Sequence, residues 1–187
     1  MLFPQCGGPQ EWPRGDSPRV GDKDRDQGMA SIFKEYDLRG LYGSELTDAD
    51  AYALGRALVT LLQCRRVAVG RDIRPHSEPL FRELARGLSE AGAEVLDLGH
   101  CSTPQSYFGN GSLGADAGVM ITASHNPKEY NGFKLSRAGA LPISGATGIR
   151  DLERLVAERA FAPVAATPGV VRRVDVSEAY RERVHQT

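Results

Sequence analysis

Residues 65–98 have the sequence RRVAVGRDIRPHSEPLFRELARGLSEAGAEVLDL, which contains the patterns of a strand, a helix and a second strand. The first seven residues, Arg65–Arg71, have small apolar residues at their centre and predict a buried strand. A helix is predicted at about 77–91, and Gly92 is the residue type that commonly follows a helix C-terminus. The second strand is predicted at Glu94–Leu98. Two strands joined by a helix form a right-handed crossover between parallel strands, so this stretch predicts an α/β fold.

The alternation of helix and strand patterns continues on both sides of this unit. Apolar residues at helical spacing follow Thr47, a typical N-cap residue, and an apolar strand at 117–122 follows a helical segment near Pro104. Further along the chain the sequence predicts an extended piece at 132–136, a helix at 144–159, a strand at 169–174 and a helix at 176–184. We therefore expect a three-layer α/β/α domain with a mostly parallel mixed sheet.

The amino-acid composition changes near residue 29, and this change divides the chain. Residues 1–28 contain five glycines, four prolines and nine charged residues. Such a segment buries too little apolar surface to offset its ordering entropy. We expect a disordered tail at 1–28, the α/β/α domain at 29–175, and a helix or linker at 176–187.

Composition and charge are those of a globular protein and exclude several classes of partner. Of the 187 residues, 41% are hydrophobic and 25% are charged, and 23 basic against 24 acidic side chains give a net charge of −1. No positive excess indicates binding to nucleic acid. The sequence has neither the pattern of a secretory signal nor an apolar run long enough to cross a membrane. A cytoplasmic location is therefore expected.

The three cysteines are too few and too widely spaced to indicate a disulfide framework or a zinc site. Cys64 and Cys101 lie beside apolar segments, which predicts buried and unreactive thiols.

The most informative polar segment begins where the predicted strand at 117–122 ends. Thr122-Ala123-Ser124-His125-Asn126-Pro127 presents hydroxyl, imidazole and amide groups at the carboxyl end of a strand, where ligands gather in α/β folds. Ser124 is a candidate nucleophile, since a neighbouring base or cation activates a serine hydroxyl, and His125 and Lys134 are groups of that kind. From the residues alone, a plain polar loop accounts for the segment equally well.

Three other segments have both functional and purely structural explanations. Arg39, within 36–40, offers a planar fork for phosphate or carboxylate, but spacing alone favours a surface arginine in a turn. Arg71 and Asp72, at a strand end, suit a ligand contact, but spacing alone favours a local ion pair between them. The G-x-G-x-x-G pattern at 109–114 follows a helix and precedes a strand, the reverse of the dinucleotide-binding order, and is interpreted as a loop.

Taken together and in this order, four motifs of the chain resemble the first domain of the α-D-phosphohexomutase superfamily, in its phosphomannomutase/phosphoglucomutase branch. They are Y-D-L-R-G at 36–40, G-R-D at 70–72, T-A-S-H-N-P at 122–127 and N-G-F-K at 131–134. The resemblance covers about residues 31–184. It implies an enzyme that moves a phosphoryl group between the 1- and 6-positions of a hexose phosphate, which is an isomerase activity.

The resemblance also implies a role for each matching residue. Ser124 would carry the phosphoryl group, Lys134 would act as general acid and base, and the two would be assisted by His125 and Arg39. Contacts to substrate and phosphate are implied for Tyr36, Arg39, Asn126 and Arg71. A magnesium ion would bind an oxygen of the Ser124 phosphate, and a bisphosphorylated hexose would act as activator.

The family's chain has four domains, and the motifs of the second to fourth have no match in this sequence. These motifs are the D-G-D-x-D-R metal loop, the sugar-recognition loop and a phosphate-binding loop. We therefore expect domain I alone, with domains II–IV as possible partners, and negligible mutase turnover from this chain by itself. The alternative is a non-catalytic domain that serves as a binding or assembly module. A serine hydrolase is excluded, since no G-x-S-x-G elbow surrounds Ser124.

Overall fold

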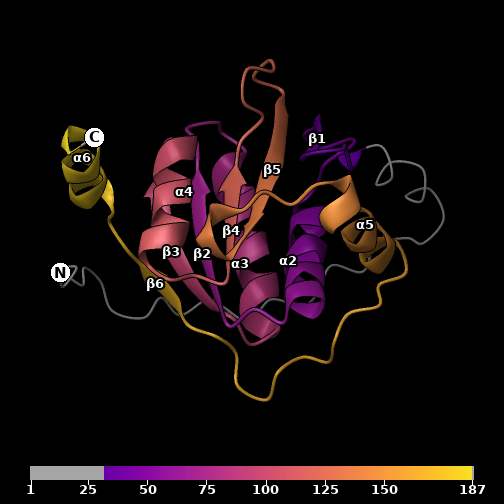
Figure 1. The fold of residues 1–187 in the computed structure, drawn as a ribbon. Helices are drawn as coiled ribbons and strands as arrows, with labels where there is room; N and C mark the ends of the chain where they lie inside the picture. Colours follow the sequence, from indigo (N-terminus) through magenta and orange to yellow (C-terminus); the bar gives the residue numbers. More distant parts are fainter. Residues whose placement is uncertain (1–31, 187) are drawn as a thin grey trace.

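A six-stranded mixed sheet forms the middle layer of the computed structural model, which describes residues 32–186 (Figure 1). The strands are, in chain order, β1 (Leu38–Leu41), β2 (Arg66–Arg71), β3 (Glu94–His100), β4 (Ala117–Ile121), β5 (Tyr130–Arg137) and β6 (Val171–Arg173). Their order across the sheet is β1-β5-β4-β2-β3-β6. β4, β2, β3 and β6 are parallel to one another, whereas β5 and β1 are antiparallel to their neighbours. The predicted mostly parallel mixed sheet is confirmed. The disordered tail predicted at 1–28 lies outside the described residues.

Helices cover both faces of the sheet and complete the three layers. They are α2 (Asp48–Leu62), α3 (Ser77–Glu90), α4 (Thr103–Ser112) and α5 (Ile149–Ala157), with 3₁₀ turns at Ala138–Ala140 and Gly145–Thr147. A further helix, α6 (Ser177–His185), contacts α4. Successive residues of β2 face different layers: Val67 and Val69 belong to the large core with α2 and α3, and Ala68 belongs to the smaller core with α4. The predicted α/β/α arrangement is therefore confirmed. Within residues 32–186, no helix is both long enough and apolar enough to cross a membrane.

α2 and α3 approach so closely that their contact requires glycine on each helix. A Cβ added to Gly55 would lie 2.6 Å from the carbonyl oxygen of Leu84. A Cβ added to Gly87 would lie 2.3 Å from the carbonyl oxygen of Tyr52. Both distances are far shorter than van der Waals contact, so any larger residue would push the helices apart. This contact fixes α3, whose N-terminus follows directly on the loop after β2.

The turn predicted around Arg39 is wrong, because Leu38–Leu41 forms strand β1. This strand pairs antiparallel with β5 and places Arg39 opposite Gly132. Gly132 is required at this point, since a Cβ there would lie 2.1 Å from the carbonyl oxygen of Leu38. A strand of four residues is too short to display a clear alternation of polar and apolar positions, which is why the sequence favours a turn.

The loop predicted at 109–114 is also wrong for its first four residues, since α4 continues to Ser112. The helix begins with a capping box, in which the Ser102 side chain accepts from the Gln105 amide. Glycine suits position 109 because a Cβ there would lie 2.6 Å from Leu98 Cδ1 on β3. The turn comes at Gly114, whose φ of 62° is in the left-handed region that favours glycine. The glycine at position 109 is therefore explained by its packing against Leu98 on β3, and it does not mark the end of the helix.

The remaining predicted elements are present with shifted boundaries. The helix predicted at 144–159 is divided, because Gly148 has a φ of 148° and separates the second 3₁₀ turn from α5. β3 extends two residues beyond the predicted Leu98. The strand predicted at 169–174 is limited to the three residues of β6, which pair with β3. The helix predicted at 176–184 is present as α6.

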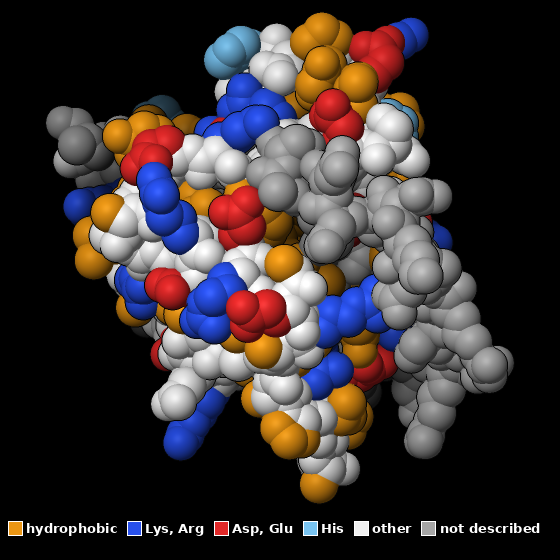
Figure 2. Space-filling view, turned by 90° about the vertical axis from the view of Figure 1, so that its right-hand side faces the viewer, with side chains coloured by type: hydrophobic (Ala, Val, Ile, Leu, Met, Phe, Trp, Pro, Cys, Tyr) orange, Lys and Arg blue, Asp and Glu red, His pale blue; other side chains and the backbone are white. Residues whose placement is uncertain are grey.

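Positive and negative side chains are intermixed on the side of the molecule next to α5 and β1 (Figure 2). On the part of this face that is not grey, Lys and Arg side chains lie next to Asp and Glu side chains. One example in α5 is Arg154, which lies within 3.5 Å of Glu158 and 3.9 Å of Asp151. The mixture agrees with the near-zero net charge of the sequence.

Candidate active site

The loop between β4 and β5, residues 122–129, is called the serine loop here because it contains Ser124. It lies beside the loop that follows β2. β4 and β2 are parallel, with Ile121 opposite Arg71. One residue further on, the Asp72 amide donates to the Ile121 carbonyl oxygen at 3.0 Å. Both loops therefore leave the sheet at the same end, the carboxyl end of the parallel strands. In open α/β sheets this end is where ligands bind.

Ser124 has an exposed side chain and an unusual backbone conformation. Its φ is 57°, in the left-handed region that non-glycine residues rarely adopt. Its amide donates to Thr122 Oγ1 at 2.9 Å, and its hydroxyl oxygen is 3.4 Å from His125 Nδ1. A conformation of this kind costs of the order of 1–3 kcal/mol and occurs most often at functional sites. The family resemblance predicts that the phosphoryl group is carried at this position, where the hydroxyl is exposed.

Asp37 links two of the predicted site residues, Arg39 on β1 and Lys134 on β5. One of its oxygens, Oδ2, forms an ion pair with the Arg39 guanidinium and lies 3.5 Å from Lys134 Nζ. All three side chains are largely but not fully buried, with exposed fractions of 14% to 25%. Burial and, after it, the charge of Asp37 raise the pKa of Tyr107. A single carboxylate therefore holds two cations next to the serine loop.

Arg39 also contacts the serine loop directly. Its Nη1 donates to Asn126 Oδ1 at 3.0 Å. Its Nε is buried, and no hydrogen-bond partner for it is present among the described residues. An unpaired donor on a guanidinium is well suited to an oxyanion, since arginine forms charge-assisted bonds with phosphate. Arg39, Lys134 and Asn126 are thus brought together, as the sequence predicts.

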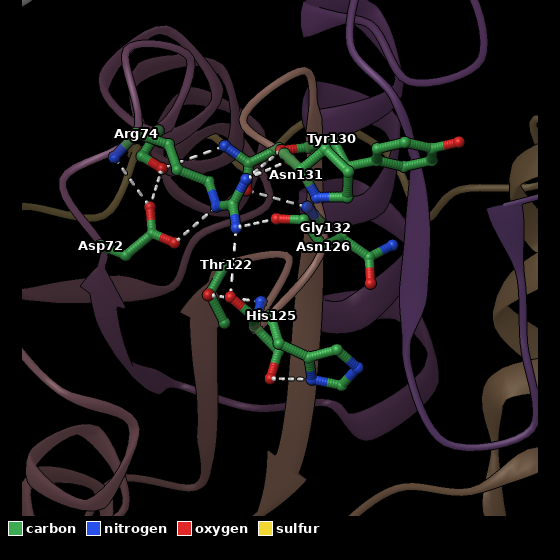
Figure 3. A network of polar contacts seen from close by, with 11 residues as sticks. Asp72, Arg74, Thr122, His125, Asn126, Tyr130, Asn131 and Gly132 are labelled. Atoms are coloured by element: carbon green, nitrogen blue, oxygen red, sulfur yellow. Dashed lines mark hydrogen bonds and ion pairs between the residues drawn. The ribbon is translucent and has the colours of Figure 1, made fainter.

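The side chain of Arg74, in the loop after β2, binds backbone carbonyl oxygens of the serine loop and of Tyr130 (Figure 3). Its Nη1 donates to the carbonyl oxygens of Pro127 at 2.6 Å and Tyr130 at 3.1 Å. Its Nη2 donates to those of Asn126 at 2.7 Å and Ser124 at 3.1 Å. The sequence does not single out Arg74. The available signal is its place two residues after Asp72, in a loop that the parallel sheet brings next to the serine loop.

A buried chain of polar groups anchors this arginine to the sheet. Asp72 forms an ion pair with Arg74 Nε at 3.1 Å and accepts from Ser77 Oγ at 2.6 Å. Ser77 Oγ accepts in turn from Asn131 Nδ2 at 3.0 Å, and Asn131 Oδ1 accepts from the Gly132 amide at 2.9 Å. Ser77 and Asn131 are fully buried. The start of α3, the loop after β2 and the start of β5 are therefore one connected unit.

Two predicted binding residues lie apart from these contacts. Arg71 is 7% exposed, and its guanidinium is bound to Asp97 at 2.6 Å and Glu78 at 2.8 Å and lies over the Phe81 ring. The local Arg71–Asp72 ion pair that spacing favours is wrong, because the buried Asp97 lies on the neighbouring strand β3 and outcompetes it. Tyr36 is 73% exposed and faces solvent.

A known family contains this arrangement of sheet and loops. Residues 30–163 match the family model described as phosphoglucomutase/phosphomannomutase, alpha/beta/alpha domain I. This chain belongs to the phosphoglucomutase/phosphomannomutase family. The phosphohexomutase resemblance, predicted from the motifs, and the α/β/α fold, predicted from the alternation of helix and strand patterns, are confirmed.

Curated relatives of the chain include phosphomannomutases and a phosphoglucomutase, which are isomerases. A phosphomannomutase of Klebsiella pneumoniae is 48% identical over 151 residues, which are 80% of this chain and 96% of the relative. A phosphomannomutase of Escherichia coli is also 48% identical over 151 residues, which are 33% of its length. A phosphoglucomutase of Neisseria gonorrhoeae is 39% identical over 156 residues, 82% of this chain and 33% of the relative.

Solved structures of the same family share the fold. A phosphoglucomutase/phosphomannomutase family protein of Burkholderia thailandensis superposes with a TM-score of 0.75 at 34% identity. A putative phosphomannomutase of Thermus thermophilus superposes with a TM-score of 0.72 at 32% identity. In both cases the match covers 82% of this chain and 35% of the other. The chain thus spans about a third of these structures and of the Escherichia coli relative, but almost all of the Klebsiella relative.

Asp37 is a second site residue of this phosphohexomutase domain to which the sequence assigns no role. The available signal is the spacing of Asp37 and Arg39, an acidic and a basic side chain two residues apart. An acidic and a basic side chain at that spacing predict an ion pair.

The described part of the chain does not form a metal site by itself. Within residues 32–186, no group of three or more His, Cys, Asp and Glu side chains is arranged to hold a metal ion. The carboxylate nearest to Lys134, that of Asp37, is already paired with two cations. Magnesium normally needs several oxygen ligands, so these residues do not fit a resident ion.

The cysteines are separate from this site. Cys64 is 5% exposed, and burial raises the pKa of its thiol to about 12. Cys101 is partly buried, and burial raises the pKa of its thiol as well. Both thiols are therefore poor nucleophiles near neutral pH, which supports the prediction of unreactive cysteines.

Proposed function

We propose that this chain is the phosphoryl-carrying domain of a phosphohexomutase and that Ser124 carries the phosphoryl group. The observation that carries the proposal is the position of Ser124: its exposed hydroxyl is held on a strained backbone in the loop that Arg39 of the Arg39–Asp37–Lys134 cluster contacts through Asn126. Membership of the phosphoglucomutase/phosphomannomutase family supports it. A hexose phosphate as substrate and a cytoplasmic location belong to the same proposal and rest on the family alone.

The reaction moves a phosphoryl group and returns it. The bond between phosphorus and Ser124 Oγ breaks as a hydroxyl of the sugar phosphate forms a new bond to phosphorus. We propose Lys134 as the group that gives a proton to Ser124 Oγ as the bond to phosphorus breaks and takes up the proton of the sugar hydroxyl. In the reverse sense, the other phosphoryl of the resulting bisphosphorylated sugar is transferred back to Ser124. The sugar leaves with its phosphoryl at the other position.

The positive charges near Ser124 serve this transfer electrostatically. A phosphoserine carries roughly −1.5 to −2 charges near neutral pH, and it would repel an incoming phosphosugar. Arg39 remains cationic throughout and has an unpaired buried Nε, so it is suited to an equatorial phosphoryl oxygen. Asn126 holds the Arg39 fork in place, and His125 is the imidazole nearest to the Ser124 hydroxyl.

Tyr36 and Arg71 complete the proposed binding residues. Tyr36 is exposed and free to contact a ligand. Arg71 would have to release Asp97 or Glu78 before binding a phosphate. Magnesium is proposed only as a partner of the phosphoryl oxygens on Ser124, and a bisphosphorylated hexose as the donor that phosphorylates this serine. No step of the proposed transfer is assigned to the metal.

Phosphorylation of Ser124 is tested by mass spectrometry. The purified chain is incubated with glucose 1,6-bisphosphate and magnesium, and the modified residue is identified in the peptides. We expect one phosphoryl group on Ser124, none in Ser124→Ala, and unchanged uptake in Ser112→Ala, which removes another exposed serine hydroxyl. A phosphoryl group on a different residue, or uptake that persists in Ser124→Ala, would overturn the proposal.

We further propose that these 187 residues alone give negligible mutase turnover, since the aligned part spans about a third of the Escherichia coli relative. A coupled assay with glucose 1-phosphate and mannose 1-phosphate tests this statement. Turnover that disappears in Ser124→Ala would show that one domain suffices. A chain that neither turns over nor accepts a phosphoryl group would favour the binding or assembly module.

A further inference from the structure

Arg74 makes more polar contacts with the serine loop than any other described side chain. Four carbonyl oxygens accept from its guanidinium, those of Ser124, Asn126, Pro127 and Tyr130, at 2.6 to 3.1 Å. Three of these residues lie in the loop and the fourth begins β5. The Arg74 side chain is only 13% exposed, and its bonds to Asn126 and Tyr130 are partly buried.

The contact with Ser124 concerns the residue with the strained backbone. A left-handed conformation at a serine persists only where the surroundings determine it strongly. On the N-terminal side Thr122 Oγ1 accepts from the Ser124 amide, and on the C-terminal side Arg74 binds the Ser124 carbonyl oxygen. These two contacts fix both peptide groups of Ser124.

The same contacts determine which way the loop peptides point. In a trans peptide the N–H and C=O groups point in opposite directions, and no cis peptide is present among the described residues. Carbonyl oxygens that face Arg74 therefore direct the amides of His125 and Lys128 away from it. The His125 ring lies on the far side of the loop from Arg74 (Figure 3), and the Ser124 hydroxyl is next to that ring. The positive ends of these peptides thus face away from Arg74.

We propose that Arg74 is a positioning residue, which binds the backbone of the serine loop from behind and so holds Ser124 in its left-handed conformation with its hydroxyl presented for phosphoryl transfer. Asp72 holds Arg74 Nε, and Ser77 holds Asp72, so the orientation of the guanidinium is set by the start of α3. The effect of Arg74 on phosphoryl transfer rests on the function proposed for Ser124. Its role in holding the conformation of the serine loop does not.

The structural part is tested by amide hydrogen exchange on the full chain, followed by NMR. In Arg74→Met the amides of Asn126 and Tyr130, which are bonded within the loop, exchange about tenfold faster, the effect of one lost hydrogen bond. Amides of β2 and β3 keep their protection. Arg74→Lys, which keeps the charge but not the fork, gives a smaller increase. The control Arg82→Met removes an exposed arginine of α3 and leaves the loop unchanged.

The chemical part is tested by the rate at which glucose 1,6-bisphosphate phosphorylates the chain. In Arg74→Ala the displaced Ser124 hydroxyl lowers the maximal rate of phosphorylation by about a hundredfold, while the half-saturating donor concentration stays unchanged. Added methylguanidinium restores part of the rate in Arg74→Ala. The unchanged half-saturating concentration and the rescue by methylguanidinium distinguish a positioning role of Arg74 from a general loss of structure.

The two proposals fail in different ways. Unchanged loop exchange in Arg74→Met overturns the role of Arg74, whatever happens at Ser124. Faster exchange at every amide, in Arg74→Met and Arg74→Lys alike, also overturns it, because Arg74 would then support the whole fold. Faster loop exchange without phosphorylation of the native chain supports the positioning of the loop and overturns the function proposed for Ser124.

Discussion

At the scale of single residues, the left-handed φ of Ser124 has an energetic signature that does not depend on its chemistry. Ser124→Gly and Ser124→Ala both remove the hydroxyl, but only glycine adopts this φ without a steric cost from Cβ. We expect the glycine variant to be more stable than the alanine variant by about 1 kcal/mol in urea unfolding. Equal stability of the two would contradict a strained backbone in the native protein.

Cys64 makes the stability of the fold depend on pH in the alkaline range. Its pKa rises from 9.0 to about 12 on folding, first through burial. Below pH 9 the thiol is protonated in both states. Above pH 9 it ionises in the unfolded chain but not in the folded one, so the free energy of unfolding falls as the pH rises towards 12.

Unfolding of the native chain and of Cys64→Ala, measured between about pH 8 and pH 11, isolates this contribution. The fall in stability should be shallower in Cys64→Ala, while the tyrosines with raised pKa values contribute equally to both proteins. Identical slopes would mean that Cys64 ionises as easily in the folded protein as in the unfolded one.

Sequence information at this scale identifies groups better than it identifies their partners. Ser124, Arg39, Asn126 and Lys134 are found through motifs, and the structure brings them together. Arg71 is found as well, but its ion-pair partner, Asp97, comes from a neighbouring strand that no local spacing indicates. The bonds of Arg74 are to backbone carbonyls, which every residue has, so no pattern of side chains reveals them.

At the scale of elements, glycines in helices provide a matched pair of substitutions. Gly87→Ala places a Cβ 2.3 Å from the Tyr52 carbonyl oxygen and should destabilise the protein by about 1–3 kcal/mol. Gly111→Ala in α4 meets no atom within 4 Å and should stabilise it by up to about 1 kcal/mol. Thermal unfolding of both variants checks the two signs. A neutral Gly87→Ala would mean that α2 and α3 separate without cost.

Element types are predicted well where a segment has a long periodic pattern, as in α2, α3, β2 and β4. Two kinds of segment are predicted wrongly. β1 has only four residues, and its strand conformation depends on pairing with β5, far along the chain. The end of α4 contains glycines, one of which packs against the Leu98 side chain, although local propensity disfavours a helix there.

At the scale of the whole molecule, the C-terminal residues contribute unequally to stability. α6 has no buried residues, and its aromatic contact is an edge-to-face pair of Tyr180 with Phe108 of α4. In contrast, Val171, Val174 and Val176 are almost fully buried. A chain that ends at residue 176 should therefore unfold cooperatively, with a loss of only about 1 kcal/mol.

A chain that ends at residue 170 should lose several kilocalories per mole, because three buried side chains at about 1.5–3 kcal/mol each are removed. Calorimetry of both shortened chains tests the difference. If the two lost the same stability, β6 would not belong to the cooperative core. The result also bears on the predicted boundary between a domain at 29–175 and a helix or linker at 176–187.

The antiparallel return of β5 has a consequence for the order in which the protein is assembled during synthesis. β1 emerges from the ribosome before β2, β3 and β4, but its partner is made after all three. β2, β3 and β4, with α2, α3 and α4, can collapse together while Arg39 still has no strand to pair with. Only when residues 130–133 emerge does β1 join the sheet, and Arg39 then reaches Asn126. A nascent polypeptide halted before Tyr130 would therefore contain β2, β3 and β4 but lack the contact of Arg39 with the loop of Ser124, and α5 and β6 would complete the core later still.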